Sequence, residues 1–426
     1  MFRKILFFVA AILCCMGLLI FFQFQHAEER KNTPLDPSNG SKNIEKEPVP
    51  KIDKNEALLQ SMTLEEKIGQ MLIVGYTEPT PTQQVQEVIQ QGKIGGIVLF
   101  NRNYANVDQM VQVVNQVNAW NTSNPLPLFI SIDEEGGSVS RIPQEGTQFP
   151  DAPLLGKIDE EMLTHQMGIV IGKELKALGV NLNYAPVLDI VFSKGNKLLV
   201  KRSFGNTPEL VAKHGLQFIE GLQAQGVIGV GKHFPGHGAT TIDSHTQLPQ
   251  IMIDKKTLLS RELIPFKAVI HQGIDALMVG HIALPMIDAS GLPASRSRIL
   301  LHNLLRTELG FDGLVITDDI EMGAYVDNQV NLEEAVLQSI DAGVDVFLVC
   351  HSYNIQQEII RIIKKAVKDH RLSENRIDAS VLRVIRVKNK YHLSPPRMID
   401  LESTKSILGT KDHKAVAEEI KRRAKK

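Results

Sequence analysis

The sequence predicts an α/β protein, a single (β/α)8 barrel preceded by an N-terminal membrane anchor and a linker. Short apolar runs alternate with longer amphipathic stretches along most of the chain, which is typical of a parallel sheet with helices on both faces. About eight such units fit a barrel better than a doubly wound sheet, which usually has fewer strands. Polar motifs follow the apolar runs, as expected when loops at the carboxyl ends of barrel strands build the site.

The composition is that of a large folded chain. It has 426 residues, of which 43% are hydrophobic and 22% are charged, with a formal net charge of -1. This composition supports a sizeable core, and the even charge balance argues against a nucleic-acid partner.

Residues 1–27 are interpreted as a membrane-targeting segment. Arg3 and Lys4 precede an apolar run over 5–22, which as a helix would be roughly 27 Å long, close to the thickness of a bilayer core. The residues after the run match a signal-peptidase site poorly, which favours a retained anchor with the body facing outside. A cleaved signal peptide, giving a secreted protein, is the alternative, and lipidation at Cys14 or Cys15 is a minority hypothesis.

Three further segments follow this one. Residues 28–54 contain a stretch rich in Pro, Ser, Asn, Lys and Glu, the composition of a solvated tether. Residues 55–393 form the predicted barrel, which opens with a helix whose capping box is Thr63-Leu64-Glu65-Glu66. Residues 394–426 form a polar tail that either packs as a final helix or stays mobile.

Only Cys350 lies beyond the anchor, which excludes an intramolecular disulfide there. We expect a monomer.

The strands and helices are predicted from the apolar pattern. The expected strands are 94–100, 128–133, 182–190, 227–233, 276–281, 313–317 and 344–349, with 71–75 as a possible eighth. The helices expected between them include 107–119, 159–178, 208–224, 256–271, 297–309, 332–342 and 355–368.

The densest group of reactive side chains is KHFPGHGATTIDSH at 232–245, after the fifth predicted strand. Gly236 and Gly238 allow backbone conformations closed to other residues, so this loop is built to a defined shape. Asp243 and His245 are two residues apart, close enough in a turn for the carboxylate to orient the imidazole. We interpret this pair as a general acid/base, because an ordinary histidine titrates near pH 6.5.

Carboxylates end two other predicted strands. VITDDIEM at 315–322 places Asp318 and Asp319 at the end of the seventh strand, where a strand-end acid can act as nucleophile or metal ligand. DEEGGSVSR at 133–141 follows another strand with acids and a glycine turn, and these acids could bind sugar hydroxyls.

Together with KRSFG at 201–205, these three motifs resemble those of bacterial β-N-acetylhexosaminidases of glycoside hydrolase family 3. The resemblance runs from about Met62 to Leu393. It implies that Asp318 forms a covalent glycosyl-enzyme and that His245, held by Asp243, is the acid/base, with retention of anomeric configuration. It also implies that the sugar hydroxyls are bound by Asp133, Arg202, Lys232 and His233.

The resemblance implies no metal and no cofactor, although zinc ligation by His and Asp is a conceivable alternative. Many relatives have Gln and Arg where this chain has Glu134 and Ser138, which puts outer-subsite contacts in doubt. Because the chain stops soon after the barrel, we expect barrel loops alone to complete the site.

Several residues have plainer interpretations. Asp319 and Glu321 are expected to be structural partners of the strand end, and His237 to hydrogen-bond within its loop. Glu134 and Glu135 are left as either loop acids or substrate contacts. His281 could line the site, and Trp120 is expected to pack rather than stack on sugar.

The predicted reaction is therefore the hydrolysis of terminal β-linked N-acetylglucosamine from cell-wall fragments. Three alternatives stay open: a family 3 enzyme for another β-sugar, a phosphorolytic N-acetylglucosaminidase, and a non-catalytic wall-binding protein. Phosphorolysis stays open because a neutral imidazole, unlike a carboxylate, does not repel an anionic acceptor. The acid/base loop argues against another sugar, and the nucleophile argues against a binding protein.

Overall fold

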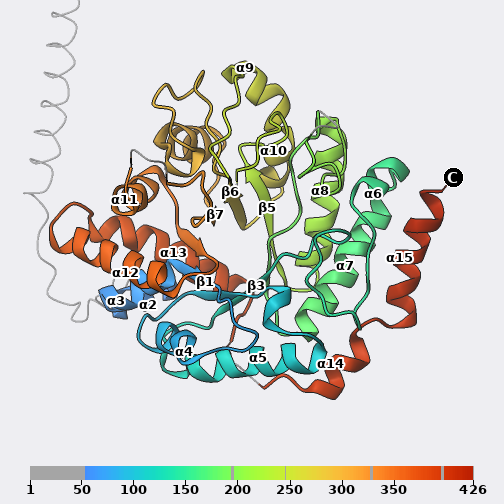
Figure 1. Cartoon of the computed structure of the whole chain (residues 1–426), viewed down its shortest axis with the longest axis horizontal. Helices are drawn as coiled ribbons and strands as arrows, with labels where there is room; N and C mark the ends of the chain where they lie inside the picture. Colours follow the sequence, from blue (N-terminus) through green and yellow to red (C-terminus); the bar gives the residue numbers. More distant parts are fainter. Residues whose placement is uncertain (1–52, 193–195, 245, 327–329, 395–397, 426) are drawn as a thin grey trace, which may run out of the picture. The chain divides into compact units, whose positions relative to one another are not determined.

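The computed structural model describes residues 53–192, 196–244, 246–326, 330–394 and 398–425, and residues 53–426 form one compact unit. Eight parallel strands pair in sequence order, and the last pairs with the first to close a barrel (Figure 1). The strands are β1 (Leu72–Val74), β2 (Gly96–Val98), β3 (Phe129–Ile132), β4 (Leu182–Asn183), β5 (Ile228–Phe234), β6 (Ala276–Val279), β7 (Leu314–Asp319) and β8 (Val346–Val349). The predicted barrel is confirmed, including its early first strand.

Alternation along each strand divides the core into two layers. Leu314 and Ile316 of β7 belong to the cluster inside the barrel, whereas Val315 packs in the cluster beneath the helices. Because both faces are covered, the strands read as continuous apolar runs. The expected strand at 182–190 is shorter than predicted, since it ends at Asn183. Pro186, which has no amide hydrogen to donate, follows closely.

Helices surround the strands (Figure 1). They are α2 (Lys54–Ser61), α3 (Leu64–Gln70), α4 (Gln83–Gln90), α5 (Val107–Trp120), α6 (Pro153–Ile158), α7 (Glu161–Ala177), α8 (Pro208–Gln223), α9 (Lys255–Thr257), α10 (Ile264–His271), α11 (Leu332–Ala342), α12 (Tyr353–Lys368), α13 (Glu374–Lys390), α14 (Leu401–Ile407) and α15 (Lys411–Arg423). The capping box at Thr63 and Glu66 is present. Trp120 packs against the core, as expected.

Two expected helices differ in detail. The helix predicted over 256–271 consists of α9, a π-helix at Leu258–Glu262 and α10. Pro265 lies in the first turn of α10. Backbone amides in a first turn have no acceptor within their helix, so the missing amide hydrogen of proline costs no hydrogen bond there. The helix predicted over 297–309 is a π-helix at Ile299–Glu308.

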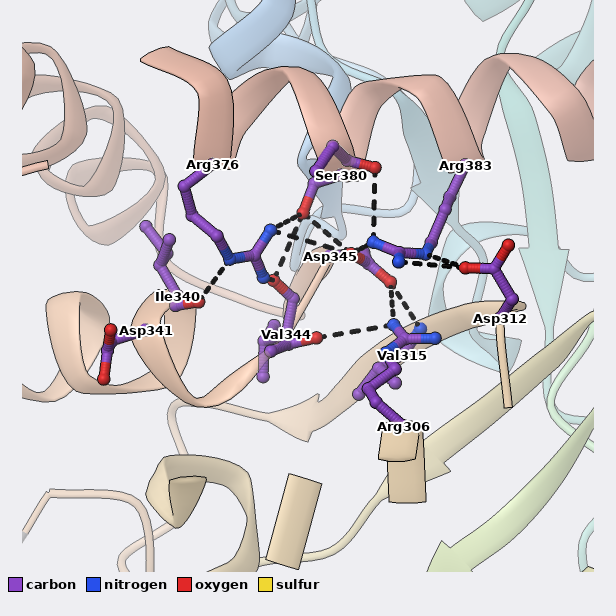
Figure 2. Close-up of polar contacts among 12 residues, drawn as sticks. Arg306, Asp312, Val315, Ile340, Asp341, Val344, Asp345, Arg376, Ser380 and Arg383 are labelled. Carbon is purple, nitrogen blue, oxygen red and sulfur yellow. Dashed lines mark hydrogen bonds and ion pairs between the residues drawn. The ribbon is translucent and has the colours of Figure 1, made fainter. Parts of the chain in front are cut away.

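A buried carboxylate fastens the amino-terminal end of the barrel. Asp345 directly precedes β8, and its Oδ2 accepts hydrogen bonds from Arg306 at 2.5 Å and from the Val315 amide at 3.0 Å. Its Oδ1 accepts from Ser380 at 2.7 Å and from Arg383 at 3.4 Å. Figure 2 shows this network between α13 and the strands. Residues at this end of the barrel hold the fold together and leave the opposite end for chemistry.

The C-terminal tail is helical and packed. α14 and α15 lie against α7, and α15 also contacts α6 (Figure 1). The buried carboxylate of Glu174 accepts bonds from the Gly409 amide at 2.9 Å and from Thr147 at 2.7 Å. Among the described residues, no helix is long and apolar enough to cross a bilayer. The predicted anchor lies outside the described residues.

Candidate active site

Three strands bring predicted site residues to the carboxyl end of the barrel. Asp133 follows β3, Lys232 lies in β5 and Asp318 lies in β7. Each continues the inward-facing series of its strand, because side chains two apart point to the same face. Lys232 Nζ lies 2.7 Å from Asp133 Oδ1. The strand geometry therefore gathers an ammonium and carboxylates inside one barrel mouth.

A buried ion network joins the predicted sugar-binding residues. Glu135 accepts two bonds from Arg202, at 2.7 and 2.8 Å, and its Oε1 lies 2.6 Å from Lys232 Nζ. Burial alone would raise the pKa of Glu135, but Lys232 and Arg202 outweigh it and lower that pKa to about 2. Asp133 and Glu135 together raise the pKa of Lys232 against its burial. Such fixed donors and acceptors suit the recognition of sugar hydroxyls.

Asp189, a fully buried carboxylate, organises the strand-end histidines. Its Oδ2 lies 2.6 Å from Nδ1 of His233, and its Oδ1 accepts from the His237 amide at 2.7 Å. Burial would raise the pKa of Asp189, but its interaction with His233 and these hydrogen bonds keep it below its usual value. The carboxylate fixes the tautomer of His233 and directs Nε2 away from it.

Asp318 is held ionised at the end of β7. Burial raises its pKa, but His233, His281, the Asp319 amide and Lys232 together lower it below the usual value. The Asp319 amide donates to Asp318 Oδ1 at 2.9 Å. An ionised, partly exposed carboxylate at a barrel mouth can attack an electrophilic carbon.

His281 supports this strand end from beneath. It is buried, its Nε2 lies 3.1 Å from the Asp319 carbonyl oxygen, and its Nδ1 lies 2.8 Å from Ser295 Oγ. Burial lowers the pKa of His281, although Asp318 acts in the opposite direction. His281 therefore neighbours the predicted nucleophile through its charge and the main chain.

Asp319 and Glu321 bind the turn after β8, as expected of structural partners. Asp319 Oδ1 accepts from the amides of Cys350 and Glu321, each at 3.2 Å. Glu321 accepts from the amides of His351 at 2.6 Å and Ser352 at 3.1 Å.

The loop after β5 is shaped by close packing. A side chain at Gly238 would place its Cβ 1.6 Å from the Ile190 carbonyl oxygen, and Gly236 has a φ of 120°. His237 Nε2 lies 3.3 Å from Ser244 Oγ, so this histidine does hydrogen-bond within its loop. Asp243 is part of this loop, and its carbonyl accepts from the Thr246 amide at 3.1 Å. His245 lies outside the described residues, so its pairing with Asp243 stays a prediction.

Glu134 is a loop acid with a defined task. Its Oε2 accepts from Ser140 Oγ and from the amides of Arg141 and Ile142 at 2.7–3.0 Å, and its Oε1 accepts from the Gly136 amide. Burial raises the pKa of Glu134 to about 7. The carboxyl group therefore clamps the turn that follows Asp133 and Glu135.

Sequence reasoning missed Asp189 and left Glu135 undecided between loop and substrate. Asp189 stands inside the run 182–190, which reads as an apolar strand, and a carboxylate in such a run was the available signal. Arg202 and Lys232 both bind Glu135, and Lys232 also binds Asp133, so these residues lie in one cluster.

Comparisons with known proteins agree with this architecture. A family model described as "Glycosyl hydrolase family 3 N terminal domain" matches residues 63–387. "Beta-hexosaminidase A" of Pseudoalteromonas piscicida is 32% identical over 360 residues, which cover 79% of this chain and 60% of that protein. The chain thus spans less than two thirds of that relative. "Beta-hexosaminidase" of Nitrosospira multiformis is 35% identical over 270 residues, covering 61% of this chain and 74% of the relative.

Solved structures show the same likeness. A glycoside hydrolase family 3 β-N-acetylglucosaminidase from Paenibacillus sp. str. FPU-7 superposes with a TM-score of 0.79 at 35% identity, covering 85% of this chain and 69% of the other. The β-glucoside phosphorylase BglX, at 24% identity and a TM-score of 0.76, shares the fold.

Proposed function

This chain belongs to glycosyl hydrolase family 3 and is a glycosidase, and from that premise we propose that it is a retaining exo-β-N-acetylglucosaminidase acting on peptidoglycan fragments. The observation that carries the proposal is the ionised carboxylate of Asp318, which faces a mouth lined by Asp133, Lys232 and Glu135. The names of the β-hexosaminidase relatives support the sugar, and the predicted anchor supports a wall-derived substrate.

The first chemical step forms a bond and breaks one. An Asp318 carboxylate oxygen attacks the anomeric carbon from the face opposite the leaving group. The glycosidic oxygen departs with the bonding electrons and takes a proton from His245, which Asp243 holds. The product of this step is a covalent glycosyl-aspartate and a free sugar hydroxyl.

The second step reverses the roles. Neutral His245 accepts a proton from water as the water oxygen attacks the anomeric carbon, and the Asp318 carboxylate leaves. Two displacements at one carbon retain the anomeric configuration. Lys232, Arg202, Asp133 and His233 hold the sugar hydroxyls during both steps, so the reacting carbon stays aligned with Asp318.

Release of 4-nitrophenol from its β-N-acetylglucosaminide tests the proposal, with the β-glucoside as a second substrate. We expect Asp318→Ala to lower kcat by roughly a thousandfold or more. Asp312→Ala is the matched control. Asp312 is exposed, pairs with Arg383 and precedes β7, whereas Asp318 lies near the carboxyl end of that strand. Equal activity in both variants, or a preference for the glucoside, would contradict the proposal. Sugar 1-phosphate formed in phosphate buffer would identify phosphorolysis instead.

We also propose that the protein is exported as a monomer and held at the membrane by residues 1–27. The apolar run after Arg3 and Lys4 supports this location. Fractionation of cells that produce the full-length chain tests it. Recovery from the membrane fraction with an intact N-terminus is expected, and release into the medium after cleavage would overturn the anchor.

A further inference from the structure

Two arginines lie beside each other at the barrel mouth, outside the network that binds Glu135. Arg102 follows β2, and its guanidinium lies 4.0 Å over the ring of Phe100. Its Nε donates to the Tyr76 carbonyl and its Nη2 to the Cys350 carbonyl, both at 2.8 Å. The guanidinium is therefore fixed by neutral acceptors, which leave its positive charge without a bonded carboxylate.

Arg141 comes from the neighbouring loop after β3. Tyr104 donates to its carbonyl at 2.6 Å, and Asn101 Nδ2 donates to the Ser140 carbonyl at 3.2 Å, so the two loops are tied together. The Nε of Arg141 is buried without a hydrogen-bond partner. Within the described part of the chain, no carboxylate forms an ion pair with this guanidinium. A buried donor without a partner is costly, and an incoming acceptor would satisfy it.

The acids near these arginines are engaged elsewhere. Glu134 accepts the amides of its own turn, and Glu135 is bound by Arg202 and Lys232. Asp319 Oδ2 lies 3.3 Å from His351 Nε2. Burial lowers the pKa of Arg102, and the charge of Arg141 lowers it further, while Asp319 acts in the opposite direction. The pair thus repel each other, and an anion bound between them would relieve that repulsion.

The same corner of the mouth borders the sugar pocket. Val98 pairs with Ser131, so Phe100 stands two residues on, beside Asp133 at the end of β3. The Phe100 ring stacks on His351 with centroids 5.9 Å apart, and His351 contacts Asp319, next to the predicted nucleophile. His351 is 44% exposed as a side chain, so its ring is open to a ligand.

We propose that Arg102 and Arg141, with the Phe100–His351 ring pair, form the subsite for the leaving-group sugar and bind a carboxylate carried by that sugar. This inference rests on the proposed function and adds the charge of the preferred substrate. Arginine suits the role because its fork of N–H donors matches carboxylate geometry. Half-exposed rings beside it can support the apolar face of a sugar ring.

The test compares two disaccharides that differ only in charge. Both carry N-acetylglucosamine linked β-1,4 to N-acetylmuramic acid without peptide, one with the free lactyl carboxylate and one with that carboxylate converted to a primary amide. For the full-length enzyme we expect kcat/KM to favour the acid roughly tenfold, which corresponds to about 1.4 kcal/mol. The preference should shrink as sodium chloride is raised.

Arg141→Gln is expected to reduce the acid-to-amide ratio of kcat/KM to about one, and Arg141→Lys to restore part of it. Arg361→Gln, an exposed arginine paired with Glu358 on α12, is the matched control and should keep the ratio of the unmodified enzyme. Arg141 is the first choice because its guanidinium has no protein partner among the described residues. Thermal unfolding of each variant verifies that it is folded.

The outcomes separate this inference from the function it rests on. A ratio near one in the unmodified enzyme, or the same ratio in Arg141→Gln as in the control, overturns the carboxylate subsite while the glycosidase assignment stands. A peptide-bearing fragment that is preferred over the free acid only when its peptide is charged would move the carboxylate from the sugar to the peptide and also overturn it. Inactivity of the unmodified enzyme toward every β-N-acetylglucosaminide overturns the proposed function itself.

Discussion

Asp189 Oδ2 lies 2.6 Å from Nδ1 of His233, and the other oxygen of the same carboxylate accepts the His237 amide at 2.7 Å. One fully buried acid therefore sets the orientation of a predicted sugar-binding ring and the start of the loop that carries Asp243. Its position after β4 links the fourth and fifth strands at the mouth of the barrel. Asp189 is a positioning residue, because it acts through His233 rather than on the sugar.

Replacing Asp189 should therefore affect both stability and substrate binding. Asp189→Ala leaves the His237 amide and the His233 ring without their acceptor, and we expect a loss of roughly 3 kcal/mol of unfolding free energy. Asp189→Asn keeps one acceptor oxygen and should lose less. Urea unfolding and steady-state kinetics on the aryl N-acetylglucosaminide measure the two effects. A normal KM in a folded Asp189→Ala enzyme would show that His233 needs no such support.

Glu135 should be essential because two buried cations depend on it. Glu135→Ala removes the carboxylate that Arg202 and Lys232 share, and we expect a destabilisation of roughly 3–5 kcal/mol. Glu135→Gln keeps the shape but removes the charge, so the pKa of Lys232 should fall toward its usual value. Thermal melts and KM report these effects. If both variants have the same melting temperature as the unmodified protein, the ion network contributes no stability.

The pH profile should show Asp318 as an unusually acidic nucleophile. The nucleophile acts as a carboxylate, so activity is present above its pKa and is lost as pH falls through it. Because the pKa of Asp318 lies below the ordinary 3.8, the acid limb of kcat/KM assigned to this group should fall below about pH 4. His281→Gln removes a ring whose interaction with Asp318 lowers this pKa, so the limb should move upward. If the acid limb of a folded His281→Gln variant does not move, His281 does not influence the pKa of Asp318.

The sequence pattern predicted the barrel because each strand is covered on both faces and each predicted motif follows a strand. Asp133, Lys232 and Asp318 could be expected to meet, since inward positions at neighbouring strand ends share one mouth. Residues whose partners come from distant loops could not be predicted in this way. Glu135 reaches across to Arg202, and Asp189 reaches across to His233, contacts that depend on loop paths which apolar periodicity does not encode.

The helices show the same limit. Residues 256–271 have one continuous apolar face, yet the Leu263 amide bonds to the Leu258 carbonyl five residues back, which inserts a π-turn before α10. Pro265 then starts the next helix. Periodicity predicts the buried face correctly and is insensitive to such a local change in winding.

Glu134 should make the stability of the protein depend on pH. Burial raises its pKa from 4.5 to about 7, so the folded state holds the proton more tightly than the unfolded state. Stability from this group is therefore full below about pH 4.5 and declines as pH rises through 7, by at most about 3 kcal/mol. Glu134→Gln should lack this decline between pH 5 and 8 in urea unfolding. Glu145→Gln, at an exposed position, is the control and should keep it.

Asp345 should matter for stability and not for the reaction. It precedes β8 at the end of the barrel opposite Asp318, and Arg306, Arg376 and Arg383 surround it (Figure 2). Asp345→Ala leaves these guanidiniums without their shared buried acceptor, so we expect unfolding free energy to fall by roughly 3–5 kcal/mol. Asp341→Asn is the control, because Asp341 is exposed and its carboxylate lies 3.5 Å from Arg298.

The two ends of the barrel can then be compared in one experiment. At a temperature where both proteins stay folded, kcat/KM of Asp345→Ala should equal that of the unmodified enzyme, since no step of the reaction reaches the amino-terminal end of the strands. Asp189→Ala, at the carboxyl end, should lose kcat/KM under the same conditions. A drop in kcat/KM for folded Asp345→Ala would mean that strain at the base of β8 is transmitted through Leu348 and Asp319 to the nucleophile, a coupling that the Ile320 amide bond to the Leu348 carbonyl at 3.1 Å could carry.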